Sequence, residues 1–342
     1  MTRSSFGHIE YVAHRRYRVY WREDGRQRTK RIQGTRDDAE AFLARVRSGS
    51  ASVADCTYSE YWRRFVLPTM DGLAPKTVQG YKQVWSHDLQ PAIGSMMVGS
   101  TDWRTVQRVL DGIQSPSVQR AAYRLWSKIA NMAVRDGILK ANPVNRSIKL
   151  RQLKKRPKEL YGPSELLDVL HLYCGKYRYL LVLELCAGLR HEEACAVMRG
   201  DVRMEDGRAV VSVSKALTVV DGVRHLRGTK TALSERLVPL SEPFASMLGE
   251  CWMPETEHQL VLPTTATHNW RKWCEKHDVC YVPFGQMRSN FATLACECAD
   301  SSLVSLYMGH SDGTTRGRNY QQSTMRGMAI VADAFAGYVC AK

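Results

Sequence analysis

Leu180-Leu181-Val182-Leu183-Glu184-Leu185-Cys186-Ala187 leads directly into Gly188-Leu189-Arg190-His191-Glu192-Glu193. The first part is almost entirely apolar, which predicts a helix buried on all sides. Arg190 follows at the end of that helix, where a planar guanidinium can present a fork of N–H donors to phosphate oxygens. For this segment alone, an arginine that caps the C-terminus of the helix is the competing interpretation.

Three later segments combine apolar runs with conspicuous polar residues. Val210-Val211-Ser212-Val213 and Arg236-Leu237-Val238-Pro239-Leu240 predict strands on either side of Gly228-Thr229-Lys230-Thr231-Ala232-Leu233-Ser234-Glu235. Val282-Pro283-Phe284-Gly285-Gln286-Met287-Arg288 continues into a helix-like Ser289-Asn290-Phe291-Ala292-Thr293-Leu294. Leu306-Tyr307-Met308-Gly309-His310-Ser311 is followed by Tyr320, ten residues after His310.

In order, spacing and local sequence, these segments resemble the catalytic domain of the tyrosine recombinase, or phage integrase, family. Gly-Leu-Arg with a glutamate three residues later resembles its first arginine box, and Lys-Thr before Arg-x-Val-Pro-Leu resembles the hairpin that carries its catalytic lysine. Arg288 before Phe-Ala-Thr-Leu resembles the second arginine box. Met308-Gly309-His310-Ser311 resembles a Leu-Gly-His-Ser box with Met in place of Leu.

The resemblance implies five catalytic residues, namely Arg190, Lys230, Arg288, His310 and Tyr320. Tyr320 would attack a DNA phosphate and form a 3′-phosphotyrosine, while Lys230 would act as the general acid for the departing 5′ oxygen. The other three would match the charge of the transition state. Lys215 competes with Lys230 for the role of acid, but it lies farther upstream of the Val-Pro-Leu strand. The implied reaction needs no metal and no other cofactor.

The second arginine box departs from the family pattern His-x-x-Arg-His at two positions. Gly285 stands at the first histidine and Ser289 at the last. The first departure matters more, because that histidine helps to position the scissile phosphate or to transfer a proton. Either a neighbouring group or water takes its place, or the enzyme is slow, or it is inactive.

The implied function is a site-specific DNA recombinase that integrates or excises a phage or another mobile element. Its implied partners are double-stranded DNA attachment sites and three further copies of the chain, in a homotetramer on DNA. A host DNA-bending protein and a directionality factor are further candidate partners. The alternatives are a DNA-binding accessory protein of the same ancestry without catalysis, and a type IB topoisomerase, which would lack an N-terminal arm-binding domain.

The charge of the chain favours a nucleic-acid partner. Its 342 residues carry 49 Lys and Arg against 34 Asp and Glu, a net charge of +15 with pI ≈ 9.4. Such a surplus is either tolerated as self-repulsion or neutralised by a polyanion. No apolar run approaches the 18 or more residues of a membrane span, so we expect a cytoplasmic protein without a membrane partner. The family resemblance implies that it lies on DNA in a bacterial host cell.

The first 50 residues are the most basic piece, with twelve Lys and Arg against six Asp and Glu. Ile9-Glu10-Tyr11-Val12, Tyr17-Arg18-Val19-Tyr20-Trp21 and Arg26 to Ile32 predict three strands, with Asp24-Gly25 as a turn. Thr35 predicts the cap of a helix whose apolar face is Ala39, Phe42, Leu43 and Val46. The pattern resembles the arm-type DNA-binding domain of phage integrases. Its candidate DNA-binding residues are Arg15, Arg16, Arg18, Arg22, Arg26 and Arg28.

Helical periodicity dominates the next hundred residues, after the small-residue segment Ser48-Gly49-Ser50-Ala51-Ser52. We expect four helices, over Thr57 to Leu67, Ala74 to Leu89, Thr101 to Leu110 and Ser117 to Arg135. Thr101 is the predicted N-cap of the third helix, and Gly112 and Gly137 lie just past helix ends. The segment resembles the core-binding domain of integrases, which grips the face of the crossover site opposite the catalytic domain.

A basic run with no acidic residue joins the two halves, from Arg146 to Lys158. Such a run is commonly a solvated linker, but between two DNA-binding halves it can follow phosphates, with Lys154, Lys155 and Arg156 as candidates.

The sequence therefore predicts an α+β multidomain chain. It comprises a small three-stranded sheet with a helix (1–49), a four-helix core-binding bundle (53–148), a basic linker (149–158) and a mainly helical catalytic domain with a small β-sheet (159–342).

The ten cysteines form no disulfide framework and suit reduced, mostly buried thiols. Cys274-x-x-His277-x-x-Cys280 has the spacing of metal ligands but lacks a fourth ligand, so ordinary helix and core positions are the favoured interpretation.

Overall fold

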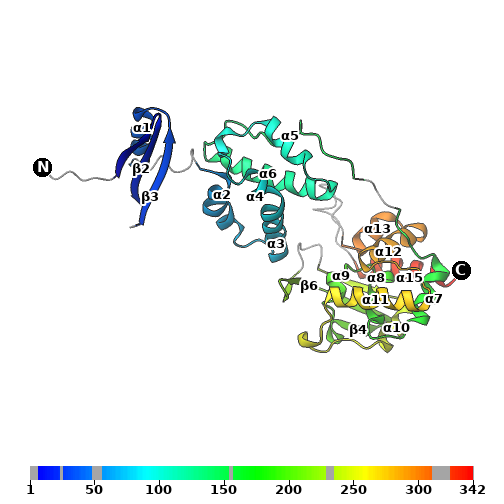
Figure 1. The fold of residues 1–342 in the computed structure, drawn as a ribbon. Coiled ribbons are helices and arrows are strands. Elements are labelled where there is room, and N and C mark those ends of the chain that lie inside the picture. The colour runs from blue at the N-terminus through cyan, green and yellow to red at the C-terminus, as the bar shows by residue number, and fades with distance from the viewer. Residues whose placement is uncertain are drawn as a thin grey trace. The chain divides into compact units, whose positions relative to one another are not determined.

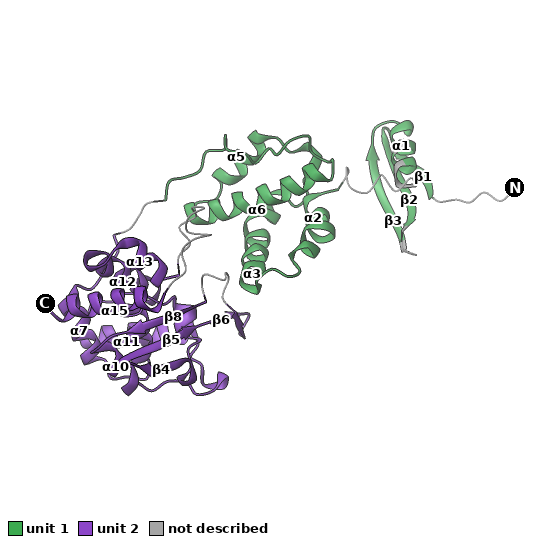
Figure 2. Ribbon diagram, turned by 180° about the vertical axis from the view of Figure 1, so that it is seen from behind, with its two compact units in different colours: residues 1–155 green, residues 156–342 purple. Residues whose placement is uncertain are grey.

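The computed structural model describes residues 7–23, 26–47, 56–153, 157–228, 235–309 and 324–341 (Figure 1). Two compact units make up the chain, residues 1–155 and residues 156–342 (Figure 2). Within the described ranges, the buried apolar side chains form three clusters, two in the first unit and one in the second. The predicted α+β class is confirmed. The three-domain division remains a prediction, and residues 48–55, which contain its first joint, lie outside the described residues.

The N-terminal sheet has the predicted three strands, β1 (Gly7–Ala13), β2 (Arg16–Glu23) and β3 (Arg26–Gln33), antiparallel and in that order. Val19 is fully buried against Ala39 and Phe42 of α1 (Arg36–Arg47). The predicted cap is present, since the Thr35 hydroxyl accepts a hydrogen bond from the Asp38 backbone N–H at 3.3 Å. The Asp24-Gly25 turn and the Val46 side chain lie outside what the structure describes.

The helical part of the first unit contains more breaks than the periodicity predicts. Among its described residues, the π-helical segments η1 (Trp62–Val66) and η3 (Trp85–Leu89) bring the indoles of Trp62 and Trp85 face to face, with ring centroids 4.6 Å apart. The helices are α2 (Tyr58–Tyr61), η1 (Trp62–Val66), η2 (Leu67–Met70), α3 (Pro75–Val84), η3 (Trp85–Leu89), α4 (Gln90–Ile93), η4 (Val98–Ser100), α5 (Trp103–Asp111) and α6 (Pro116–Arg135).

The predicted N-cap at Thr101 is wrong. The cap of α5 is Asp102, whose side chain accepts a hydrogen bond from the Thr105 backbone N–H at 2.8 Å. Thr101 is instead buried, and its hydroxyl pairs with that of Tyr58 at 2.9 Å, because a buried hydroxyl requires a partner. Gly112 and Gly137 do follow the ends of α5 and α6, and Gly137 has a positive φ of 74°.

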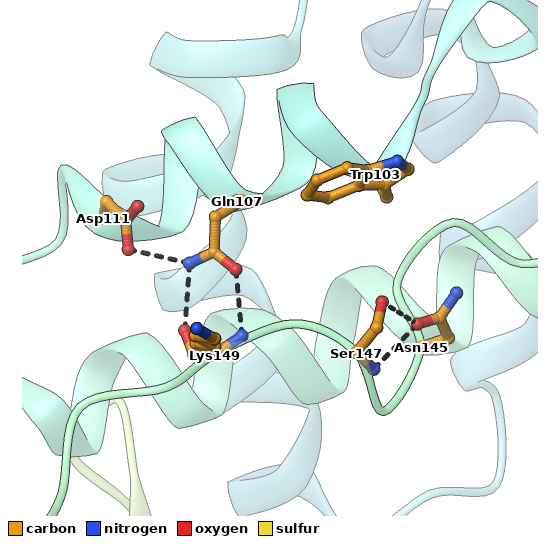
Figure 3. A pocket seen from close by; sticks show the side chains of 6 residues that line it. All are labelled: Trp103, Gln107, Asp111, Asn145, Ser147 and Lys149. Atoms are coloured by element: carbon orange, nitrogen blue, oxygen red, sulfur yellow. Dashed lines mark hydrogen bonds between the residues drawn. The ribbon is translucent and has the colours of Figure 1, made fainter.

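The first residues of the predicted basic linker lie against helix α5, to which they are hydrogen-bonded (Figure 3). The Gln107 side chain bonds both backbone groups of Lys149, at 3.0 Å and 2.9 Å, beside an open cavity of about 690 Å³ that Trp103 also lines. The Arg151 guanidinium bonds the carbonyl oxygens of Asp111 and Gln114 at 2.8 Å and 3.1 Å. Arg151 therefore binds the end of α5 in the described structure.

The second unit packs helices around a three-stranded antiparallel sheet of order β4-β5-β8. The paired strands β5 and β8 are the predicted ones, whereas the separate hairpin β6–β7 was not expected. The elements are α7 (Pro163–Leu172), α8 (Arg178–Leu185), α9 (His191–Ala194), η5 (Arg199–Asp201), β4 (Val202–Glu205), β5 (Arg208–Val213), β6 (Lys215–Val220), β7 (Val223–Gly228), β8 (Arg236–Leu240), α10 (Phe244–Glu250), η7 (Glu257–Gln259), α11 (Pro263–His277), α12 (Phe284–Cys298), α13 (Ser301–Tyr307) and α15 (Met325–Cys340).

Helix α8 lies in the core of this unit, as its apolar sequence predicts, and every residue from Tyr179 to Leu185 is buried. The chain then turns at Gly188, where φ is +62° and an added Cβ would stand 2.5 Å from the Phe291 ring. Only glycine fits this turn without strain. The turn sets the direction in which Arg190 leaves the buried helix. Within the described residues, no helix is long and apolar enough to cross a membrane.

Candidate active site

Arg190 and Arg288, the two predicted arginines that the structure describes, lie in one cluster. Arg190 precedes α9, donates to the Glu193 carboxylate at 2.5 Å, and donates to the Gly309 carbonyl oxygen at 3.3 Å. It does not act as the C-terminal cap of α8. Its side chain is 38% exposed, so one side of the guanidinium remains accessible to a ligand.

Arg288 projects from α12 into the same cluster and is more deeply buried. Its two terminal nitrogens donate to the carbonyl oxygens of Gly188 at 2.6 Å and Met308 at 2.7 Å. The side chain thereby connects the turn after α8 to the end of α13. Burial, together with Arg190 and Arg236 nearby, lowers the pKa of Arg288 below its ordinary value.

A third arginine, Arg236 at the start of β8, completes the cluster and was not predicted as a site residue. It donates to the Tyr307 carbonyl oxygen at 3.0 Å and to the Glu193 carboxylate at 3.1 Å, and its side chain is only 2% exposed. The sequence signal was an arginine opening the apolar run Arg-x-Val-Pro-Leu. Such a residue can equally be an exposed strand end, so the pattern alone does not identify it.

The three guanidinium groups bind three consecutive carbonyl groups, those of Tyr307, Met308 and Gly309. Carbonyl groups at the C-terminus of a helix lack partners within it and carry partial negative charge. The arginines satisfy these groups at the end of α13. We call Arg190, Arg236, Arg288 and Glu193 the arginine cluster.

Glu193 supplies the only carboxylate of the arginine cluster and is nearly inaccessible to solvent. Burial works to raise the pKa of Glu193, but Arg236 and the hydrogen bonds from Arg190 outweigh it, so the pKa lies below its ordinary value. Three cations around one carboxylate leave two positive charges in the cluster. An anion that reached the exposed side of Arg190 would meet donors already held in place, which is the property that stabilises a charged transition state.

Lys230, His310 and Tyr320 lie outside the described residues, as do Lys154, Lys155 and Arg156. In sequence, His310 follows directly on Gly309, whose carbonyl oxygen is bound by Arg190. The competing candidate Lys215 is described, and its ammonium pairs with Asp201 at 3.2 Å.

Gly285 and Ser289, the two residues that depart from the family pattern, lie one turn apart on α12. An added Cβ at Gly285 would meet nothing within 4 Å, so the helix surface is open there. The Ser289 hydroxyl accepts a hydrogen bond from the Lys158 ammonium at 2.9 Å.

A partly buried histidine that the sequence did not single out, His191, directly follows Arg190 at the start of α9. The His191 ring lies 2.7 Å from a Glu184 carboxylate oxygen and 3.1 Å from the Pro263 carbonyl oxygen, and it stacks on Phe284. Burial disfavours the imidazolium, yet Cys195 and Glu184 raise the pKa of His191 above its ordinary value. With both ring nitrogens engaged, His191 is a packing and positioning group.

The strand register divides the predicted arginines of the N-terminal sheet between two faces. Arg18 stands opposite Arg31, and Arg16 opposite Gln33, on the face that turns away from Val19 and α1, which we call the open face. Arg22 shares that face by alternation along β2, and Arg31 is a member that the sequence prediction omitted.

Of the remaining three predicted arginines of this sheet, the strand register places one, Arg28, on the opposite face. Arg28 pairs with Trp21 and so belongs to the side of the sheet that packs on α1. Arg15 lies in the β1–β2 turn with φ 55°, and the Arg26 side chain is outside what the structure describes.

The Cys274-x-x-His277-x-x-Cys280 segment has ordinary structural contacts. Cys274 is buried, and His277 stacks on Trp273 with ring centroids 4.5 Å apart. Among the described residues, no three potential ligands group closely enough to hold a metal ion.

Glu193→Gln should lower the free energy of unfolding by about 3–5 kcal/mol at pH 7, because it leaves buried guanidinium groups without their counterion. The pKa of Glu193 is lower in the folded chain than its ordinary value of 4.5. The contribution of the Glu193 carboxylate to stability is therefore complete above about pH 4.5, and it is lost as the pH falls through the folded pKa. Urea-induced unfolding of both proteins between pH 3 and pH 7 measures the difference.

Glu205→Gln is the matched control, since Glu205 forms an exposed pair with Arg203 and should contribute less than about 1 kcal/mol. If the two substitutions lowered the free energy of unfolding equally, the Glu193 carboxylate would not be the counterion of the arginine cluster. The same would follow if the loss caused by Glu193→Gln did not change with pH.

No family model and no curated protein matches the chain. Solved structures do match it. A fragment of the Tn1549 transposon integrase, in complex with a circular intermediate DNA, matches with a TM-score of 0.65 and 17% identity over 80% of this chain and 97% of that one. A lambda integrase dimer bound to a COC′ core site matches with a TM-score of 0.56 and 15% identity, over 93% and 97%. A lambda integrase tetramer bound to a Holliday junction matches with a TM-score of 0.55 and 14% identity, over 95% and 99%. At such identities the likeness shows the fold: this chain has the fold of these integrases.

Proposed function

We propose that this protein is a tyrosine-type site-specific DNA recombinase that cuts and rejoins DNA through a 3′-phosphotyrosine. The arginine cluster is the observation that supports this function best. Arg190 and Arg288, which stand 98 positions apart in the sequence, meet around Glu193 and bind the carbonyl groups that lead directly to His310. A guanidinium group suits the oxygens of a phosphodiester, and the Arg190 side chain is 38% exposed.

In the proposed reaction, Tyr320 gives up its phenolic proton to water as its oxygen attacks a DNA phosphorus, and the displaced 5′ oxygen takes a proton from Lys230. Arg190, Arg288 and His310 donate hydrogen bonds to the non-bridging oxygens as negative charge develops on them. The 5′ hydroxyl of a second duplex then attacks the phosphotyrosine and releases Tyr320. Each step exchanges one phosphoester bond for another, so the reaction requires no ATP.

The proposed partners are double-stranded DNA attachment sites and three further copies of the chain. The matched lambda integrase tetramer is bound to a Holliday junction, which supports a four-protein assembly here. We further propose that the protein acts on DNA in the cytoplasm of a bacterial host, for a phage or another mobile element. A host DNA-bending protein or a directionality factor would complete the assembly.

The N-terminal sheet is proposed to bind separate arm sequences of the attachment site. Its open face carries Arg16, Arg18, Arg22 and Arg31. The match to a lambda integrase structure covers 95% of this chain, so at least part of the N-terminal sheet lies within the matched region. Arginine forks can contact both phosphates and guanine edges. This sheet also argues against a type IB topoisomerase, which would lack it.

The second candidate is a DNA-binding accessory protein without catalysis, and Gly285 with Ser289 is the observation that favours it. Against it stands the persistence of Arg190, Lys230, Arg288, His310 and Tyr320 at positions that match the family pattern. The two candidates differ in whether a covalent intermediate forms.

Tyr320→Phe should abolish covalent attachment to a nicked suicide substrate while leaving the affinity for the core site unchanged, because the substitution removes one oxygen. Denaturing gel electrophoresis detects the adduct, and a mobility shift measures the affinity. Tyr338→Phe is the control, since the Tyr338 hydroxyl bonds Glu297 and its loss should leave the adduct intact. An unchanged adduct in the Tyr320 variant would assign the nucleophile elsewhere, and a wild-type protein without any adduct would favour the accessory protein.

Arg31→Ala should weaken arm-site binding by the whole protein and reduce the slope of log K against log salt by about one if Arg31 contacts a phosphate. Arg28→Ala, on the face that packs on α1, should change the slope much less. Fluorescence anisotropy across a salt series measures both, with thermal unfolding as a check on folding. Equal effects of the two substitutions would contradict the assignment of the open face.

A further inference from the structure

A lysine that belongs to no proposed catalytic position stands beside the open surface of α12. The Lys158 ammonium donates to the Ser289 hydroxyl at 2.9 Å, and Ser289 directly follows Arg288. Gly285 lies four residues before Ser289, so the two positions share one face of the helix. The ammonium group therefore lies one helical turn from the position that carries no side chain.

The backbone that carries Lys158 is fixed against α12. The Asn290 side chain is fully buried, accepts a hydrogen bond from the Tyr161 N–H at 2.6 Å and donates to the Tyr161 carbonyl oxygen at 2.9 Å. The Tyr161 hydroxyl donates to the Cys280 carbonyl oxygen at 2.6 Å. These buried bonds hold the chain three residues after Lys158, so the nearness of Lys158 to Ser289 follows from the fold and not from the reach of a long side chain alone.

The space at Gly285 can accept the ammonium group. Gly285 is exposed, an added Cβ there would meet nothing within 4 Å, and its backbone lies in the first turn of α12, where unpaired N–H groups favour an anion. The nearby Arg288 guanidinium points to the carbonyl groups of Gly188 and Met308. A phosphate oxygen above Gly285 would thus need a donor from another segment, and Lys158 is adjacent.

We propose that Lys158 is a further catalytic residue, which moves from Ser289 to the space over Gly285 and donates a hydrogen bond to a non-bridging oxygen of the scissile phosphate. This inference rests on the proposed recombinase function and adds a residue to it. An ammonium group is a compact charge with three donors, so it can stabilise the charge of the transition state as a positioned imidazole would. The Ser289 hydroxyl holds the ammonium in the absence of DNA.

The test is the single-turnover rate of covalent attachment to a nicked suicide substrate, with protein in excess and DNA saturated. Lys158→Ala should reduce this rate by about 10²-fold, the order found when one transition-state donor is removed, while the affinity for DNA changes little. Lys158→Arg should retain most of the rate. Lys272→Ala, which removes another exposed lysine of the same unit, is the control for the loss of one positive charge.

A second substitution separates this role from general attraction to DNA. Gly285→His in the Lys158→Ala background should restore at least a tenth of the wild-type rate, because the imidazole would fill the space that the ammonium reaches. A Lys158→Ala protein that reacts at the wild-type rate would overturn the proposal, as would a loss of rate that matches the loss of affinity and that Gly285→His does not restore. A wild-type protein that forms no adduct would overturn the recombinase function itself, and this proposal with it.

Discussion

The contact between the Glu193 carboxylate and the surrounding guanidinium groups is the constraint on which the second unit depends. Three arginines in a partly buried space repel one another and lose hydration, so they can assemble only if counter-charge and hydrogen-bond acceptors are provided. Glu193 provides the charge, and the carbonyl groups of Tyr307, Met308 and Gly309 provide the acceptors. One cluster thereby joins the turn after α8, the start of β8, the body of α12 and the end of α13.

In the proposed recombinase, this arrangement prepares the site before DNA arrives. The donors of Arg190 and Arg288 are oriented by bonds within the protein, so little reorganisation is needed when charge develops on a bound phosphate. Arg190 is the more exposed of the two, which suits the first contact with a phosphate. Arg288 is the more buried, which suits a donor that the protein holds in a fixed position. The helix α8 and the glycine turn at Gly188 supply the rigid base, since both are enclosed by the hydrophobic core.

The sequence was sufficient for features with a local signature. Continuous apolar residues predicted α8, and alternation predicted the N-terminal strands. Spaced motifs singled out Arg190 and Arg288, which the structure brings together around Glu193, while their catalytic roles stay predictions. It was insufficient where distant residues determine the role. Arg236 bonds a carbonyl group 71 positions away, and nothing beside it in the sequence distinguishes it from a strand end. Arg31 was omitted because pairing with β2, not composition, assigns it to the open face. Thr101 is a good cap residue by type, but its hydroxyl forms a hydrogen bond with that of the buried Tyr58 instead.

Mass spectrometry of the covalent protein–DNA complex would test the assignment of the whole site. Trypsin cleaves after Arg318 and Arg326, and the intervening peptide, 319–326, contains Tyr320 as its one tyrosine. After nuclease digestion of the complex, a residual nucleotide should be found on this peptide, linked through a 3′ phosphate to the Tyr320 oxygen. A nucleotide on a peptide that contains Tyr307 or Tyr338, or a 5′ linkage, would contradict the account.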